Sequence, residues 1–150
     1  MKHIMVLIAA LLVLGCGGQA SDEMGPYVQK MKLLEKYGKT LVEYEGYLTN
    51  EATLEKGKTL FSVVEAFHAD VFAMPIPEDK KLKALHNSLR RTLDETKKKL
   101  KDPDSITFIP SAQKRIVSMK EAILKLANNL KKLWEEDGRG EFPINLSFEA

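Results

Sequence analysis

The chain has 150 residues, of which 44% are hydrophobic and 29% charged, and its formal net charge at pH 7 is +2. This length suits one domain that buries roughly two-thirds of its unfolded surface, and the near-neutral charge argues against a nucleic acid or a strongly acidic partner. The single cysteine, Cys16, excludes an internal disulfide, a multi-thiolate metal site, an iron–sulfur cluster and a c-type haem.

Residues 1–15 have the features of a bacterial export signal. A short basic start, Met1 to His3, precedes eleven consecutive apolar residues from Ile4 to Leu14. As a helix this run spans about 16 Å, against about 30 Å for the hydrocarbon core of a bilayer, so it is too short to cross a membrane. A short apolar run with a basic flank is typical of a secretory signal.

The apolar run ends in Val13-Leu14-Gly15-Cys16, which resembles the lipobox of bacterial lipoproteins. This resemblance implies a diacylglyceryl group on the Cys16 thiol, cleavage before Cys16 and often acylation of the new amino group. Two or more acyl chains anchor a protein stably, whereas one binds only marginally. Gly17 after the cysteine implies, by the same resemblance, the periplasmic face of the outer membrane if the source is Gram-negative. An ordinary cleaved signal with a chance cysteine is the alternative.

Residues 16–24 are expected to form a flexible lipidated tether that reaches roughly 25 Å when extended. A first amphipathic helix is predicted to start at Gly25-Pro26, because apolar residues then recur every seven positions at Tyr27, Leu34, Leu41 and Leu48. A second helix is predicted from near Glu51 to Met74, where Pro75 and Pro77 stop it. Its broad apolar face comprises Leu60, Phe61, Val64, Phe67, Val71 and Met74.

A third helix is predicted to open at Glu78-Asp79 and to close at residues 102–105, with Leu82, Leu85, Leu89, Leu93 and Leu100 on one face. A fourth is predicted after Pro110-Ser111 and ends at Gly138, and its apolar face comprises Ile116, Met119, Ile123, Leu126, Leu130 and Leu133, flanked by Trp134. Short links between helices of this length predict an all-α, up-down-up-down four-helix bundle over residues 25–137.

Charged residues are expected to support this pairing of helices. Lys97, Lys98, Lys99 and Lys101 should lie at the same end of the bundle as the glutamates of the first hairpin. Each exposed pair contributes at most ~1 kcal/mol, but their sum can favour one orientation. A patch for lipid or a partner is the alternative function of this lysine run.

His68 and His86 are the two histidines beyond the signal, and each lies nine residues from Pro77. In an antiparallel hairpin centred on Pro77 they would be level, so a shared metal or a small ligand is an alternative function. Zinc sites usually have four ligands, which favours packed histidines. Glu65 and His68 match the Glu-x-x-His element of di-iron bundles, but Lys83 stands where the second glutamate is needed. No cofactor is therefore expected.

The C-terminal residues 138–150 are predicted to form an extended tail. Phe142, Ile144, Leu146 and Phe148 alternate with Pro143, Asn145 and Ser147, which is the period of extended chain. These seven residues span about 23 Å, enough to run back along a bundle groove. The tail either covers the domain's own core or binds a partner. Ile106 and Phe108 are expected to form a second extended piece.

No catalytic grouping is recognisable, so an enzyme is not expected: there is no nucleophile elbow, phosphate loop or His-Glu-x-x-His motif. The sequence predicts a membrane-anchored, non-enzymatic helical lipoprotein that binds another cell-envelope protein or a peptide. In size, lipidation and helix content it resembles pilotins, the small lipoproteins that chaperone outer-membrane secretins and take an amphipathic helix into a groove. A structural envelope spacer is a further alternative.

Overall fold

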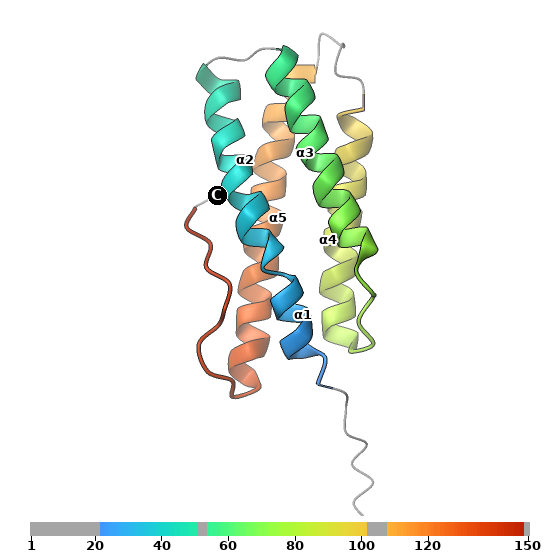
Figure 1. The fold of residues 1–150 in the computed structure, drawn as a ribbon, viewed down its shortest axis with the longest axis vertical. Helices are drawn as coiled ribbons and strands as arrows, with labels where there is room; N and C mark the ends of the chain where they lie inside the picture. The colour runs from blue at the N-terminus through green and yellow to red at the C-terminus, as the bar shows by residue number, and fades with distance from the viewer. Residues whose placement is uncertain (1–21, 51–53, 102–107, 149–150) are drawn as a thin grey trace, which may run out of the picture.

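The computed structural model describes residues 22–50, 54–101 and 108–148. Its helices are α1 (Met24–Lys30), α2 (Leu33–Asn50), α3 (Leu54–Ala73), α4 (Lys80–Lys99) and α5 (Phe108–Glu136). They form an up-down-up-down bundle in which α1 and α2 are two parts of one bent helix, which confirms the predicted fold (Figure 1). Cys16 and the rest of the lipobox-like sequence lie outside the described residues, as does Ile106.

The bend between α1 and α2 lies at Met31 and Lys32, inside the heptad pattern of the first predicted helix. The amide of Lys32 donates to the carbonyl of Gln29 at 3.3 Å, and that of Leu34 donates to the carbonyl of Met31 at 2.9 Å. Bonds from residue i to i−3 wind the backbone more tightly than an α-helix. The tighter turn redirects α1, whose Tyr27 ring meets His86 of α4 with ring centres 5.9 Å apart.

The helix ends follow local sequence signals. Asp79 caps α4, because its carboxylate accepts hydrogen bonds from the amides of Lys81 and Leu82, both at 2.9 Å. Helix α5 begins at Phe108, so the expectation that Phe108 belongs to an extended piece is wrong. Pro110 is the third residue of α5, and proline is tolerated in the first turn because amides there have no partner within the helix.

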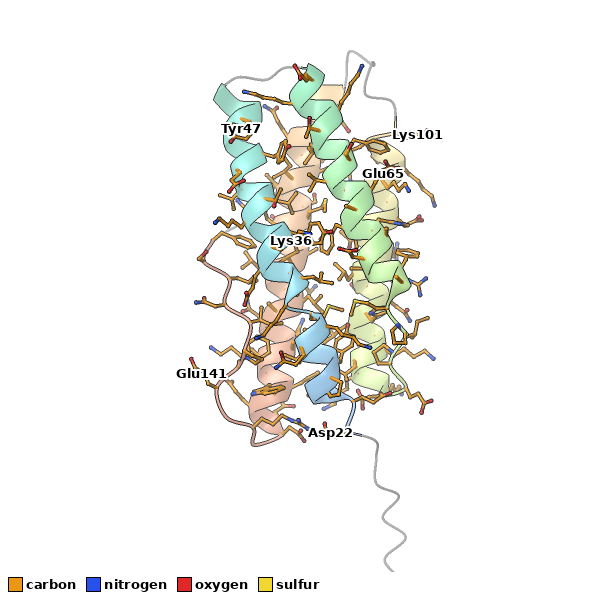
Figure 2. All side chains as sticks on the ribbon, viewed as in Figure 1. Asp22, Lys36, Tyr47, Glu65, Lys101 and Glu141 are labelled. Atoms are coloured by element: carbon orange, nitrogen blue, oxygen red, sulfur yellow. The ribbon has the colours of Figure 1, made fainter. Side chains whose placement is uncertain are left out.

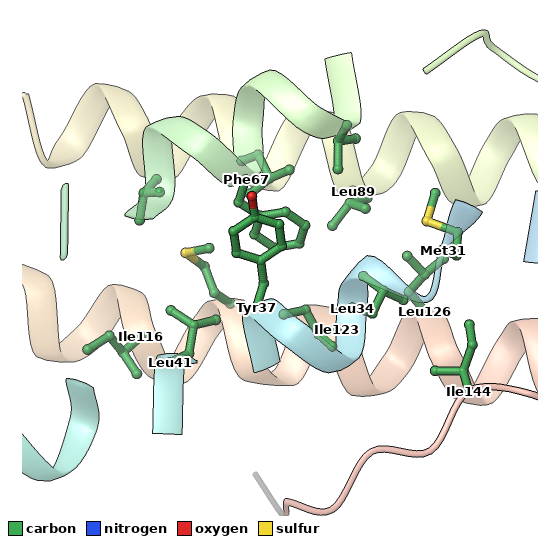
Figure 3. Packing of buried hydrophobic residues seen from close by; sticks show 14 of the residues in the cluster. Met31, Leu34, Tyr37, Leu41, Phe67, Leu89, Ile116, Ile123, Leu126 and Ile144 are labelled. Carbon is green, nitrogen blue, oxygen red and sulfur yellow. The ribbon is translucent and has the colours of Figure 1, made fainter. Parts of the chain in front are cut away.

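All four long helices and α1 contribute to one apolar core, as the predicted stripes require (Figure 3). Tyr37 of α2 stacks on Phe67 of α3, with ring centres 4.2 Å apart, and its hydroxyl donates to the carboxylate of Asp70 at 2.5 Å. The largest fully buried side chains are Phe67, Met31, Leu34, Leu41, Leu60, Leu82, Leu93, Leu100, Ile116, Ile123 and Leu130. The described helices therefore enclose a continuous core without a disulfide.

The tail reverses direction immediately after α5. Gly138 has a φ of +67°, a left-handed conformation that glycine adopts without steric cost. The amide of Arg139 donates to the carbonyl of Trp134 and that of Gly138 to the carbonyl of Glu135, which closes the helix with a Schellman motif. The extended chain then runs back beside α5 and α2, as Figure 1 shows. The predicted extended tail is thus confirmed.

Candidate functional site

The extended segment 142–148, here called the strap, covers the core between α2 and α5. Ile144 is buried, and Phe142, Leu146 and Phe148 are partly buried against the core cluster. The ring of Phe142 meets that of Trp134 edge-on, with centres 6.1 Å apart. The amide of Asn145 donates to the Glu35 carboxylate at 2.7 Å. The four alternating apolar residues of the tail therefore lie on the domain's own core.

Phe148, the last apolar residue of the strap, packs directly against the backbone of α2 at Gly38. A Cβ atom at this position would lie 2.6 Å from Cζ of Phe148 and closer still to Cε1. The absence of a side chain at Gly38 is what lets the ring approach the backbone of α2. Gly46, two turns later on the same helix, has nothing within 4 Å of such an atom. The two glycines of α2 thus have different surroundings.

Asp22, just before α1, and Arg139, just after α5, meet at the base of the bundle, the end where α1 starts and α5 stops. The guanidinium of Arg139 contacts both Asp22 and Asp137, and it donates to Asp22 at 2.5 and 3.2 Å. This hydrogen bonding lowers the pKa of Asp22 below its usual value. The carboxylate of Glu23 accepts from the amides of Glu78 and Asp79 at 2.9 and 2.8 Å. We call this set of contacts the basal clamp, and Figure 2 shows Asp22 at that end of the molecule.

His68 and His86 are not level with one another. His68 lies 3.7 Å from the carboxylate of Asp94, and Glu65, one turn earlier on α3, lies 3.4 Å from Lys97 of α4. His86 precedes Asp94 by eight residues on α4, which corresponds to about 12 Å along the helix axis. The hairpin is therefore not symmetric about Pro77, and the structure does not bring the two histidines together as one site.

Each histidine has its own packing. The His68 ring stacks on Phe72 with centres 3.9 Å apart. His86 is fully buried, with its Nδ1 3.4 Å from the hydroxyl of Tyr27 and no hydrogen-bond partner for its Nε2. Burial, reinforced by the charge of Arg90, lowers the pKa of His86, and burial raises the pKa of Tyr27. His86 is thus a core residue whose surroundings favour the neutral form of its ring.

The part of the chain that the structure describes has no group of three or more histidine, cysteine, aspartate or glutamate side chains that could hold a metal ion. Among the same residues, no helix combines the length and apolar character needed to cross a bilayer. Two lysines of the run after Leu93 have partners within the protein: Lys97 pairs with Glu65, and Lys98 with Asp94 at 2.6 Å.

An open cleft of about 290 Å³ lies between α4 and α5. Its lining combines leucines from the edge of the core with small or polar residues: Leu85, Ser88, Leu89, Thr92, Ser118, Glu121, Ala122, Lys125, Leu126 and Asn129. The strap lies in the groove that α5 forms with α2, so the cleft and the strap lie on opposite flanks of α5. Helix α5 therefore has one flank covered by an extended segment and one flank that is hollowed.

The α4–α5 cleft was not predicted from the sequence. Its signal is the pairing of small residues one turn apart, Ser88 with Thr92 on α4 and Ser118 with Ala122 on α5. Small side chains between two leucine-rich stripes leave part of the space between the helices unfilled, whereas leucines would fill it.

No protein-family model, no curated protein and no solved structure matches this chain.

Proposed function

We propose that this chain is a lipid-anchored, non-enzymatic helical lipoprotein that acts as an adaptor for another cell-envelope protein or a peptide. The proposal starts from the lipobox-like sequence that ends at Cys16, six residues before Asp22. A chain of six residues spans at most ~21 Å, so an anchored Cys16 would keep the base of the bundle near the bilayer. The rest of the bundle would extend away from that surface.

The adaptor role is supported mainly by the difference between the two flanks of α5. On one flank, an extended segment with alternating apolar residues is accommodated against the helices. On the other flank, the α4–α5 cleft combines Leu85, Leu89 and Leu126 with rim groups that can form hydrogen bonds. Apolar floors with a few polar rim groups are the usual composition of peptide-binding grooves. The partner segment we propose for the cleft is therefore extended and apolar on one side, like the strap.

The test uses the full chain expressed in a bacterial host, with a photo-crosslinking amino acid at Ser118 in the cleft or at Val117 beside it. Val117 is 41% exposed and is not part of the cleft lining, so it is the matched control. We expect a specific envelope protein to crosslink from position 118 and not from position 117.

A filling variant then links the crosslink to affinity. Ala122→Trp occupies the cleft, and we expect it to weaken binding of the identified partner at least tenfold, whereas Val117→Trp leaves binding unchanged. Equal crosslinking from positions 117 and 118 would exclude the cleft as the partner site. Unchanged partner affinity of the Ala122→Trp variant would exclude it as well.

A further inference from the structure

The connection between α3 and α4 carries an unusual exposed apolar residue. Ile76 is 45% exposed and lies between Pro75 and Pro77. The other exposed large hydrophobic residues of the described chain, Val42, Tyr47 and Val117, all lie on α2 or α5. Proline fixes its own φ and restricts the residue before it, so the two prolines limit the backbone freedom around Ile76. Ile76 is therefore held at the surface rather than free to fold inwards.

Ile76 borders an apolar depression of about 250 Å³ at the base of the bundle. Pro26, Tyr27, Pro75 and Pro77 line the same depression, which we call the basal apolar surface together with Ile76. Tyr27 and Pro77 are buried and form its floor, whereas Pro75 and Ile76 are exposed. The surface thus has protruding apolar groups around a recessed apolar floor.

The position of this surface relative to the chain indicates what it contacts. Asp22 lines the depression itself, and it lies six residues after Cys16. Six residues reach at most ~21 Å, so lipid carried by Cys16 enters the bilayer within that distance of the depression. A second contact made by a protein that is already tethered is intramolecular, with an effective concentration near the millimolar range for short linkers. A small apolar surface is then sufficient to orient the domain.

The charges at the rim favour a zwitterionic rather than an anionic lipid surface. Asp22, Glu23 and Lys30 line the depression, so both signs are present. The Asp22 carboxylate binds Arg139, and the Glu23 carboxylate binds the amides of Glu78 and Asp79. Because both carboxylates have partners within the protein, lipid headgroups need not neutralise them.

We propose that the basal apolar surface docks onto the bilayer in which Cys16 is anchored, with Ile76 inserted at the headgroup boundary. This inference rests on the proposed lipid anchorage but not on the adaptor role. Docking would fix the base of the bundle against the membrane, with the α4–α5 cleft facing sideways. The cleft would then bind a partner at a defined height above the membrane.

The experiment uses the full chain with Ile76→Cys, purified from bacterial membranes and labelled with an environment-sensitive fluorophore. Cys16 is the only native cysteine, and its acylated sulfur does not react with the label. Glu141→Cys, an exposed position near the base that does not line the basal apolar surface, is the matched control (Figure 2). Intact mass confirms acylation, and circular dichroism confirms helix content. Pro75→Cys places the label on the same surface should Ile76→Cys fail to fold.

Both proteins are reconstituted in phosphatidylcholine vesicles that contain spin-labelled lipid. We expect a blue-shifted emission and at least twofold stronger quenching at position 76 than at position 141, which the tether alone would keep equally near the bilayer. Equal quenching at the two positions in an acylated protein would overturn the docking while leaving the anchorage intact. A mass without acyl groups would overturn both. A failed partner search with strong quenching at position 76 would reject only the adaptor role.

Discussion

Replacing Gly38 by alanine tests whether Phe148 is seated on α2. The added methyl group would lie 2.6 Å from Cζ of the Phe148 ring, so the ring must leave its position. Full burial of phenylalanine contributes about 1.5–3 kcal/mol, and this partly buried ring contributes about half of that. Against this loss, alanine in a helix interior is about 0.5–1 kcal/mol more favourable than glycine. The net effect of Gly38→Ala in the native chain is a loss of about 0–1 kcal/mol.

The sign of this effect is expected to reverse when the ring is removed. In the Phe148→Ala background, Gly38→Ala meets no ring and should stabilise the bundle by about 0.5–1 kcal/mol. The two positions should therefore show a coupling free energy of about 0.7–1.5 kcal/mol, the contribution of the displaced ring, in a double-mutant cycle. Urea unfolding followed by helical circular dichroism measures all four variants, using the chain from residue 16 with Cys16→Ser so that no lipid is present.

Gly46→Ala is the control, because nothing lies within 4 Å of the methyl group it adds. It should stabilise both backgrounds equally. If Gly38→Ala has the same effect with and without Phe148, so that the two changes are additive, the strap is not seated on α2 and its covering role is refuted.

Three further predictions concern the core. His86 titrates at a lower pH in the folded protein than in the unfolded chain, so the unfolded chain binds the proton first as pH falls below about 6.5. Unfolding free energy should therefore decrease from pH 7 to pH 5, and His86→Gln should lessen that slope in urea titrations. Lys120 is buried and pairs with Glu45 at 2.6 Å. Glu45→Ala should lower the free energy of unfolding by about 1–2 kcal/mol, because it leaves the buried ammonium without this carboxylate. Lys120→Met should change the urea midpoint little, because it removes the charge together with its need for a partner. Tyr37→Phe removes the hydrogen bond to Asp70 but keeps the stacked ring, so it should lower the free energy of unfolding by about 0.5–1.5 kcal/mol. Tyr37→Ala removes the ring as well and should lower it by at least ~3 kcal/mol. Thermal unfolding measures both.

The long helices were predictable because their apolar positions recur at the helical period. Leu82, Leu89 and Leu93 of α4, for example, face the core as their spacing requires. The bend at Met31 and Lys32 was not predictable, since neither residue is a proline or glycine. The bend directs α1 so that Tyr27 meets His86, and a contact between residues so far apart in the sequence is not part of a local pattern.

The register of α3 against α4 was the main obstacle to predicting a site. Centring the hairpin on Pro77 assumed that residues equally distant from it lie level. The helix ends nearly satisfy this assumption, since Ala73 lies four residues before Pro77 and Lys80 three residues after it. The pair of Glu65 with Lys97 instead centres the hairpin near residue 81, an offset that no local pattern contains. By contrast, the strap was predictable in outline, because strict alternation from Phe142 to Phe148 has no helical interpretation.

The basal clamp has a mechanical consequence under the proposed anchorage. Tension in the tether would reach the folded domain at Asp22, where Arg139 passes part of the load to the C-terminal end of α5. Glu23 would pass another part to the start of α4 through the amides of Glu78 and Asp79. Three helices would share the force, so that drag on a bound partner could not peel α1 away from the bundle one turn at a time.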